Sequence, residues 1–205
     1  LAKILAGLLT PSMGKVILDG RDLRSFTRLE LASRIGYVYQ NPQHQLFCQT
    51  VYEEIAFGLR LQGLPNNKIE ETVEKTLAMF KLNGLKNEHP FFLSKGEKRR
   101  LALASVYALN PDIFIVDEPT TGQDRVFSEQ LFQLLRDLTQ RGKSVIVITH
   151  TVELAAKYAD RLVVLSRGKI LADGSPVEVL SRESIAREAK LRVPLIVQLC
   201  KTNPR

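Results

Sequence analysis

The sequence has 205 residues, of which 44% are hydrophobic and 25% charged, so it is long enough to bury one core. Its net charge is +7, but Lys and Arg are scattered along the chain, and we expect no nucleic-acid partner. Its apolar runs are far shorter than the roughly 20 residues that cross a bilayer, so we expect that the chain does not span a membrane. Cys48 and Cys200 lack the spacing of a zinc site or a disulfide framework, so we expect a reducing, cytosolic compartment.

The first nine residues, LAKILAGLL, have the spacing of an amphipathic helix, and no capping residue stands before them. We therefore expect that a further segment precedes this helix. Residues 14–20, GKVILDG, then resemble one strand of a small antiparallel hairpin.

Four short runs rich in β-branched residues predict strands at 34–40, 112–117, 143–149 and 161–165. Helical periods lie between the later strands, as in the apolar face over residues 127–138. Alternating apolar strands and helices predict an α/β fold with a mostly parallel sheet that helices cover on both faces. In such sheets ligands bind at the carboxyl ends of the strands.

Residues 51–109 interrupt this alternation, because their pattern is almost wholly helical. We interpret them as a helical insert that divides the core into residues 1–50 and 110–176. After residue 176 the pattern is again helical and charged, which indicates a helical tail over 177–205.

The run DIFIVDEPTT carries the strongest chemical signal, because a buried strand ends in two adjacent carboxylates. Asp117 is placed to hold Mg²⁺, and Glu118 is placed to polarise an attacking water. The alternative is a strand followed by an acidic helix cap.

A second signal is LSKGE, residues 93–97, which begins a strongly helical segment. Ser94 and Gly96 offer a hydroxyl and backbone N–H groups at the positive end of a helix, which together can bind an anion. The alternative is that Ser94 is an ordinary helix cap.

Two further polar residues follow predicted strands. His150 comes after SVIVIT and can hydrogen-bond a terminal phosphate, although a single histidine at a strand end is more often structural. Gln40 comes after RIGYVYQ and can ligate Mg²⁺ or a water, although such a glutamine is usually a turn residue.

These motifs occur in the order and at the spacing of the ABC ATPases, a P-loop NTPase family that the sequence resembles over nearly its whole length. By this resemblance Gln40 is the Q-loop glutamine, and residues 93–97, including Ser94, Lys95 and Gly96, are the signature that is commonly LSGGQ. Asp117 and Glu118 resemble the Walker B pair, Asp124 the D-loop aspartate and His150 the switch histidine. The resemblance implies ATP and Mg²⁺, and a head-to-tail dimer with a second ABC ATPase domain.

The sequence departs from the family pattern in three places. Lys95 and Glu97 replace the usual Gly and Gln of the signature, and Gln123 replaces the common Leu before Asp124. The phosphate-binding pattern GxxxxGK[ST] is absent from the sequence, although residues 1–9 resemble the helix that follows it. We therefore expect an N-terminally truncated domain that does not hydrolyse ATP when it is made alone.

Residues 40–46, 50–58 and 92–103, with the tail around Val193, Pro194 and Leu195, resemble the ATPase subunits of energy-coupling-factor importers. The resemblance implies uptake of vitamins or of transition-metal ions such as cobalt, an integral membrane partner, and a peripheral position on the cytoplasmic face of the cell membrane. Two alternatives stay open: a dimerising regulatory module that does not hydrolyse ATP, and a soluble ABC ATPase acting on DNA or ribosomes.

Overall fold

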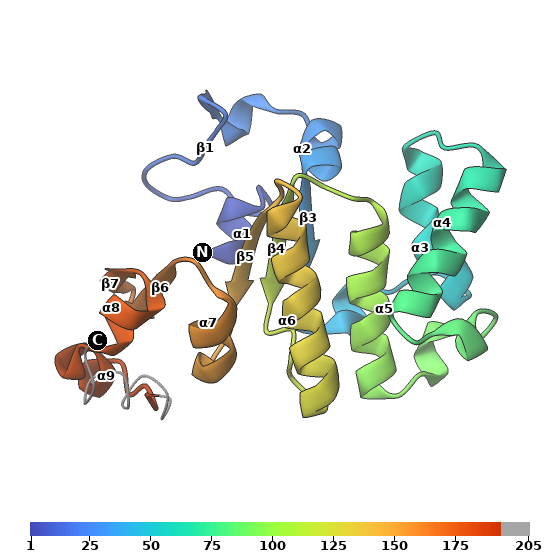
Figure 1. Ribbon diagram of the computed structural model, residues 1–205. Coiled ribbons are helices and arrows are strands. Elements are labelled where there is room, and N and C mark those ends of the chain that lie inside the picture. Colours follow the sequence, from blue (N-terminus) through green and yellow to red (C-terminus); the bar gives the residue numbers. More distant parts are fainter. Residues whose placement is uncertain (194–205) are drawn as a thin grey trace. The chain divides into compact units, whose positions relative to one another are not determined.

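The computed structural model describes residues 1–193 (Figure 1). These residues form two compact units. The first unit holds Leu1–Gln123 and Arg141–Ile148, and the second holds Asp124–Gln140 and residues 149–193. The division that the sequence predicts at residues 50, 109 and 176 stays a prediction. The part of the predicted tail that contains Pro194 and Leu195 lies outside the described residues.

The helices and strands of the first unit are, in chain order, α1 (Ala2–Leu5), β1 (Ile17–Leu18), β2 (Arg21–Asp22), α2 (Arg28–Arg34), β3 (Ile35–Val38), α3 (Val51–Leu61), α4 (Asn66–Met79), α5 (Lys95–Ala108), β4 (Ile113–Asp117) and β5 (Ser144–Ile148). Short 3-10 helices, Leu23–Ser25, Pro42–His44, Asn83–Leu85 and Pro90–Phe92, lie in the connections.

The central sheet is parallel, with the strand order β3-β4-β5 (Figure 1). On one face Ile35 and Ile115 pack with Ala6, at the end of α1. On the other face α5 lies so close to β3 that a Cβ on Gly36 would stand 2.5 Å from Val106 Cγ1. The predicted α/β fold, with helices on both faces of a parallel sheet, is therefore confirmed.

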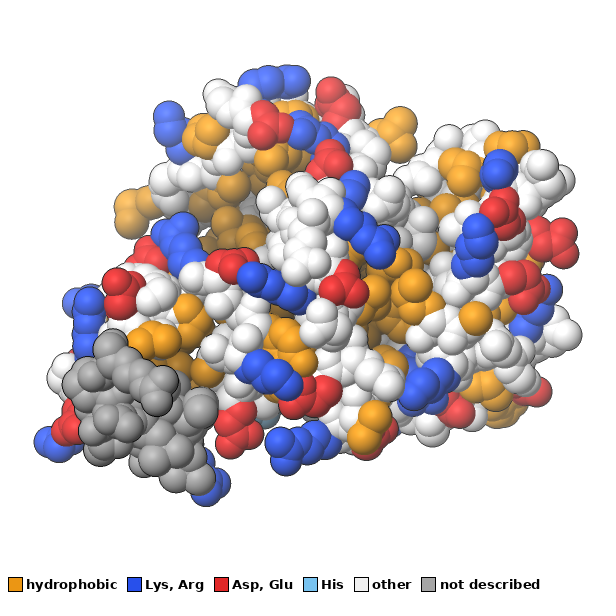
Figure 2. All heavy atoms as spheres, viewed as in Figure 1, with side chains coloured by type: hydrophobic (Ala, Val, Ile, Leu, Met, Phe, Trp, Pro, Cys, Tyr) orange, Lys and Arg blue, Asp and Glu red, His pale blue; other side chains and the backbone are white. Residues whose placement is uncertain are grey.

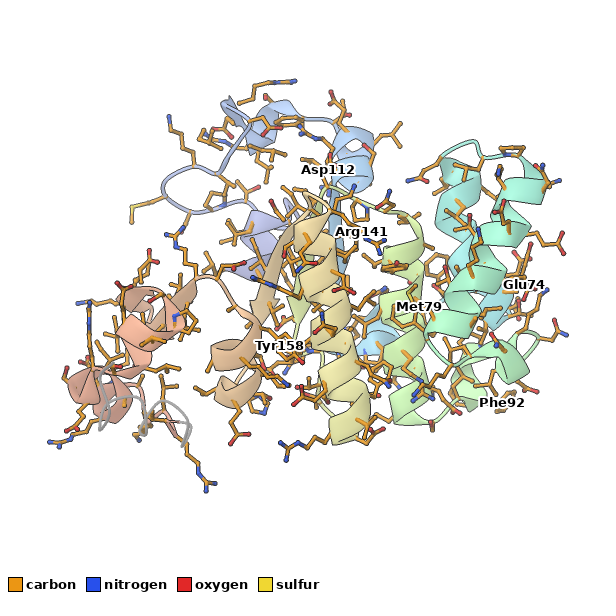
Figure 3. All side chains as sticks on the ribbon, viewed as in Figure 1. Glu74, Met79, Phe92, Asp112, Arg141 and Tyr158 are labelled. Atoms are coloured by element: carbon orange, nitrogen blue, oxygen red, sulfur yellow. The ribbon has the colours of Figure 1, made fainter. Side chains whose placement is uncertain are left out.

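Three charged residues, each standing directly before a strand, tie the amino ends of the sheet together. Arg34 Nε lies 3.8 Å from Asp112 Oδ2, and Lys143 Nζ lies 3.3 Å from Asp112 Oδ1. Asp112, labelled in Figure 3, marks this amino edge. The carboxyl edge, where the sequence places its polar residues, is the opposite one.

The helical region of the first unit consists of α3, α4 and α5, which pack on one another. Ile69, Val73 and Leu77 of α4 are fully buried, as their spacing predicts. Positive and negative side chains are interspersed over this region in Figure 2. Among them, Glu71 pairs with both Lys68 and Lys75.

The N-terminal helix is shorter than the nine residues predicted. Gly7 has φ of 71°, Gly7 N–H donates to Ile4 O and Leu8 N–H donates to Lys3 O, so a left-handed glycine ends the helix. The predicted hairpin is present as β1 and β2, joined by Asp19 and Gly20, which both have positive φ.

The second unit contains α6 (Arg125–Gln140), α7 (Val152–Tyr158), β6 (Leu162–Ser166), β7 (Lys169–Gly174), α8 (Pro176–Leu180) and α9 (Glu183–Glu188). The strand at β6 is confirmed, but among the described residues it pairs antiparallel with β7, which the sequence analysis did not predict. The cause is the two-residue turn Arg167-Gly168, whose φ values of 48° and 76° reverse the chain at once.

Candidate functional site

Two adjacent carboxylates stand at the carboxyl end of the middle strand. β4 buries Phe114, Ile115 and Val116 and ends at the half-buried Asp117. Tyr37 Oη of β3 donates a hydrogen bond to Asp117 Oδ2 at 3.2 Å. Burial, with the Asp117 charge, raises the pKa of Tyr37 to about 12, so this hydroxyl remains a donor near neutral pH. Sequence reasoning missed Tyr37, although strand alternation places it and Asp117 on the same face of the sheet.

Glu118 leaves the strand in the left-handed region, with φ of 50°. Its N–H donates to Ile148 O of β5 at 2.8 Å, which holds this first residue of the turn against the neighbouring strand. A non-glycine residue in this conformation costs on the order of 1 kcal/mol or more, and such residues gather at functional sites. The backbone conformation therefore supports a chemical role for Glu118.

Gln40 lies two residues beyond the end of β3. Because Val38 is opposite Val116 in the parallel register, Gln40 and the carboxylates leave the sheet at the same edge. Gln40 is exposed, and the chain after it forms a short 3-10 helix that begins with Asn41 Oδ1 accepting from Gln43 N–H at 3.1 Å. The structure thus places Gln40, Asp117 and Glu118 at one edge of the sheet.

The predicted anion site is the first turn of α5. Ser94 Oγ accepts from Glu97 N–H at 3.3 Å, and Glu97 Oε2 accepts from Ser94 N–H at 2.8 Å. Hydrogen bonds to the carboxylate from the side chain of Ser94, and then from its backbone N–H, hold the pKa of the Glu97 carboxyl below its usual range. Within the described residues, no protein acceptor is seen for the N–H groups of Lys95 and Gly96. Ser94 is therefore a cap, as the alternative held, and two N–H groups still point out of the helix end.

Two of the departures from the family pattern meet at this turn. Gln123 Nε2 donates to Gly96 O at 3.1 Å. The Lys95 stem passes Gly122, where a Cβ would stand 3.7 Å from Lys95 Cδ. The signature turn is thus joined to the segment that follows the Walker B strand.

Asp124 and His150 belong to the second unit. Asp124 Oδ1 accepts from Phe127 N–H at 2.8 Å at the start of α6, and Ser128 Oγ donates to Asp124 O at 2.8 Å. His150 is exposed, and its carbonyl accepts from Val152 N–H at the start of α7. Both residues lie outside the first unit, so their roles stay predictions.

Sequence reasoning also missed Arg99, which makes hydrogen bonds to backbone carbonyls at the ends of two strands. This residue of α5 is only 2% exposed, and its Nη1 donates to Tyr39 O at 2.8 Å and to Asp117 O at 3.4 Å. Burial lowers the pKa of Arg99, while the charges of Asp117 and Glu118 oppose the shift. A signal was present, because helical spacing places residue 99 on the buried face of α5 with Leu103 and Val106.

The model of the ABC transporter family matches residues 1–121. This chain belongs to the ABC transporter family. An energy-coupling factor transporter ATP-binding protein, EcfA of Methanocaldococcus jannaschii, is 38% identical to this ABC domain over 195 residues, 94% of the chain and 70% of that protein.

Other ABC proteins match as well. A putative ABC transporter ATP-binding protein of Methanosarcina acetivorans is 44% identical over 199 residues, 97% of this chain but 32% of that protein. The solved structure of cbiO1 from Clostridium perfringens, part of the ABC transporter complex cbiONQ, has a TM-score of 0.74 and 31% identity, covering 97% of this chain and 80% of that one. The chain spans about a third of the length of the first curated relatives it matches, namely 32%, 32% and 35%.

The donor set of this ABC domain fits Mg²⁺. The ion prefers carboxylate oxygens and is usually held by one or two carboxylates together with substrate phosphates. Asp117 supplies such a carboxylate, and among residues 1–193 no group of three or more His, Cys, Asp or Glu forms a complete protein cage. The Asp117 carboxylate is thus of the donor class that holds Mg²⁺ together with nucleotide phosphates.

Proposed function

We propose that this ABC domain, when joined to a phosphate-binding loop GxxxxGK[ST], which its 205 residues lack, binds and hydrolyses ATP to energise a membrane importer of the energy-coupling-factor type. The importer takes up a vitamin or a transition-metal ion such as cobalt. The observation that carries the hydrolytic part is the strand-end pair Asp117 and Glu118, whose connecting peptide is hydrogen-bonded to β5. The likeness to EcfA and to cbiO1 supports the importer class.

The side chains divide the work as follows. Asp117, with Gln40, holds Mg²⁺, which when bound neutralises charge on the phosphate oxygens. Glu118 accepts a proton from the attacking water, and His150 hydrogen-bonds the terminal phosphate. Ser94, Lys95 and Gly96 contact the nucleotide of a second ABC domain, in a head-to-tail dimer where Asp124 lies at the contact.

A docking surface for the membrane subunit is formed by Phe47 and Phe57. Both are exposed, at 65% and 41%, and their rings meet edge to face at 5.0 Å. The buried Glu54 of α3 accepts from Phe47 N–H at 2.9 Å and from Cys48 N–H at 2.8 Å, which fixes the loop. Exposed aromatics on a fixed backbone suit a partner helix. Within residues 1–193 no helix is long and apolar enough to span a bilayer. As a subunit of such an importer, the domain sits peripherally on the cytoplasmic face of the cell membrane, which the likeness to EcfA and cbiO1 supports.

The decisive test is Glu118→Gln in the assembled transporter. The change keeps shape but removes the proton acceptor, so we expect nucleotide affinity to be retained and hydrolysis to slow on the order of 100-fold or more. Steady-state phosphate release measures the rate, and nucleotide titration measures the affinity. His150→Ala should also slow hydrolysis. His44→Ala is the control, because His44 is likewise an exposed histidine, and it should leave hydrolysis unchanged. Turnover at the wild-type rate in Glu118→Gln would refute the role of Glu118.

A second candidate is a dimerising module that binds ATP without turning it over. The replacement of Gly and Gln in the signature by Lys95 and Glu97 favours it, because both change the charge at the nucleotide contact. The phosphate-release assay separates the hydrolysing subunit from the non-hydrolysing module. A non-hydrolysing module dimerises when ATP is added, but it releases no phosphate that the Glu118→Gln change could reduce.

A further inference from the structure

The Asp117–Glu118 peptide is held from both sides. Its N–H, which belongs to Glu118, donates to Ile148 O of β5 at 2.8 Å. Its C=O, which belongs to Asp117, accepts from Arg99 Nη1 of α5 at 3.4 Å. Because a peptide group is planar and rigid, hydrogen bonds to both its N–H and its C=O fix the orientation of the Asp117–Glu118 peptide plane. The positive φ of Glu118 is a rotation relative to this fixed plane. The direction of the Glu118 carboxylate thus depends on α5.

Tyr39, which directly precedes Gln40, is held by the same helix. Its C=O accepts from Arg99 Nη1 at 2.8 Å, and its N–H donates to Gln45 Oε1 at 3.3 Å. Gln45 Nε2 in turn donates to Ala102 O of α5 at 2.7 Å. Because β3 ends at Val38, the backbone groups of Tyr39 leave the strand ladder: the C=O is bonded to α5 directly, and the N–H is connected to it through Gln45.

A buried guanidinium is costly unless its charge and its donors are used. Arg99 is 2% exposed, its Nη1 reaches two carbonyls at the ends of two different strands, and the nearby carboxylates of Asp117 and Glu118 balance its charge. Lys98, one residue earlier on α5, does something quite different, because its ammonium lies 5.4 Å from the exposed ring of Phe91.

We infer that Arg99 is a positioning residue that couples the Gln40 loop to the Walker B glutamate through the signature helix α5. A displacement of the Gln40 loop pulls on Tyr39 O, and the same guanidinium passes it to Asp117 O and so to the Glu118 backbone. Gln45 is the second connection between the loop and α5. The inference rests on the proposed function in assigning the catalytic carboxylate to Glu118.

The first experiment does not need activity. Amide hydrogen exchange is followed in the chain bearing Arg99→Gln, with Lys98→Gln as the matched control on the same helix. We expect Glu118 N–H to exchange about 10-fold faster or more in Arg99→Gln and to be unchanged in Lys98→Gln, because losing one fixed end of a peptide lets the other open. Unchanged exchange at Glu118 in Arg99→Gln would overturn the inference.

The second experiment measures hydrolysis in the assembled transporter. Arg99→Gln should lower kcat about 10-fold or more while KM for ATP changes less than about 3-fold, because a positioning defect acts on the chemical step. Arg99→Lys keeps the charge but loses the planar guanidinium whose Nη1 reaches both carbonyls, so its kcat should lie between those of the wild type and Arg99→Gln. If Arg99→Gln does not fold, Arg99→Lys decides, and wild-type exchange and kcat in that variant would overturn the inference.

The outcomes separate this inference from the proposed function. Fast exchange at Glu118 with normal kcat in Arg99→Gln would overturn the positioning role of Arg99 in hydrolysis, whereas the catalytic role of Glu118 is tested separately by Glu118→Gln. Normal exchange and normal kcat in Arg99→Gln, beside an inactive Glu118→Gln, would keep the hydrolytic function and remove Arg99 from it.

Discussion

At the scale of single residues, the backbone and the buried polar groups carry more information than the exposed charges. Ion pairs on the outside of α4 join flexible side chains in water and contribute little each. Tyr37 and Arg99, by contrast, are held between elements and make hydrogen bonds to the strand ends that bear the site.

Cys48 offers a test at this scale. Burial, and then the charge of Glu54, raises the pKa of the Cys48 thiol to about 11. A raised pKa favours the neutral thiol, and the thiolate is the nucleophile, so at about pH 8 we expect iodoacetamide to label Cys48 roughly 100-fold more slowly than an exposed cysteine. The rate should rise with pH up to the folded pKa.

Labelled peptides separated by mass spectrometry follow Cys48 independently of Cys200. The control is the same protein in denaturing guanidinium chloride, where Cys48 should react at the rate of a free thiol. Equal labelling rates in the folded and denatured protein would contradict the expectation.

At the scale of elements, the contact between β3 and α5 depends on a missing side chain. A Cβ on Gly36 would lie 2.5 Å from Val106 Cγ1 and 2.7 Å from Pro111 Cγ. Gly36→Ala should therefore lower the free energy of unfolding by about 1–3 kcal/mol, because α5 must move away from the strand. Urea unfolding measures the change.

Gly84→Ala is the matched control, because a Cβ there meets nothing within 4 Å. We expect the control to stay within about 0.5 kcal/mol of the wild type. If Gly36→Ala and Gly84→Ala unfold at the same urea concentration, the prediction that α5 packs too closely on β3 to admit a Cβ at residue 36 is contradicted.

At the scale of the whole molecule, the proposed dimer is tested through Ser94. Ser94→Arg adds bulk and charge where the second domain's nucleotide is expected, so it should weaken ATP-driven dimerisation far more than ATP binding by the monomer. Sedimentation and nucleotide titration, done in the slow Glu118→Gln background, measure the two quantities.

The chain provides a close control for the lost helix cap. Ser175 caps α8 in the same way, with Glu178 N–H donating to Ser175 Oγ at 3.3 Å, as Glu97 N–H does to Ser94 Oγ. Ser175→Arg removes an equivalent cap and should leave dimerisation intact. If both variants lose dimerisation alike, Ser94 is only a cap.

Much of the fold follows from local pattern, since strands β3 to β5, the buried face of α4 and the first hairpin lie where the sequence predicts them. The errors are local too. Gly7 ends α1 early, and the turn at Arg167-Gly168 adds a strand. In both places one or two residues with positive φ set the path of the backbone, although the hydrophobic spacing around them predicts a different structure.

By itself the sequence determined the family, the α/β class and the identity of the strand-end residues Gln40, Asp117 and Glu118, because period and order along the chain encode them. Only the tertiary structure decided which side chains hold those residues in place. In the sequence, Arg99 is one of three consecutive basic residues, KRR, and nothing there distinguishes its role. The role follows from the packing of α5 on the sheet, which buries the Arg99 guanidinium against the carbonyls of Tyr39 and Asp117. Helical spacing indicates that Arg99 is buried, but its two carbonyl partners lie 60 and 18 positions away along the chain, and only the packing of α5 on the sheet brings them to it.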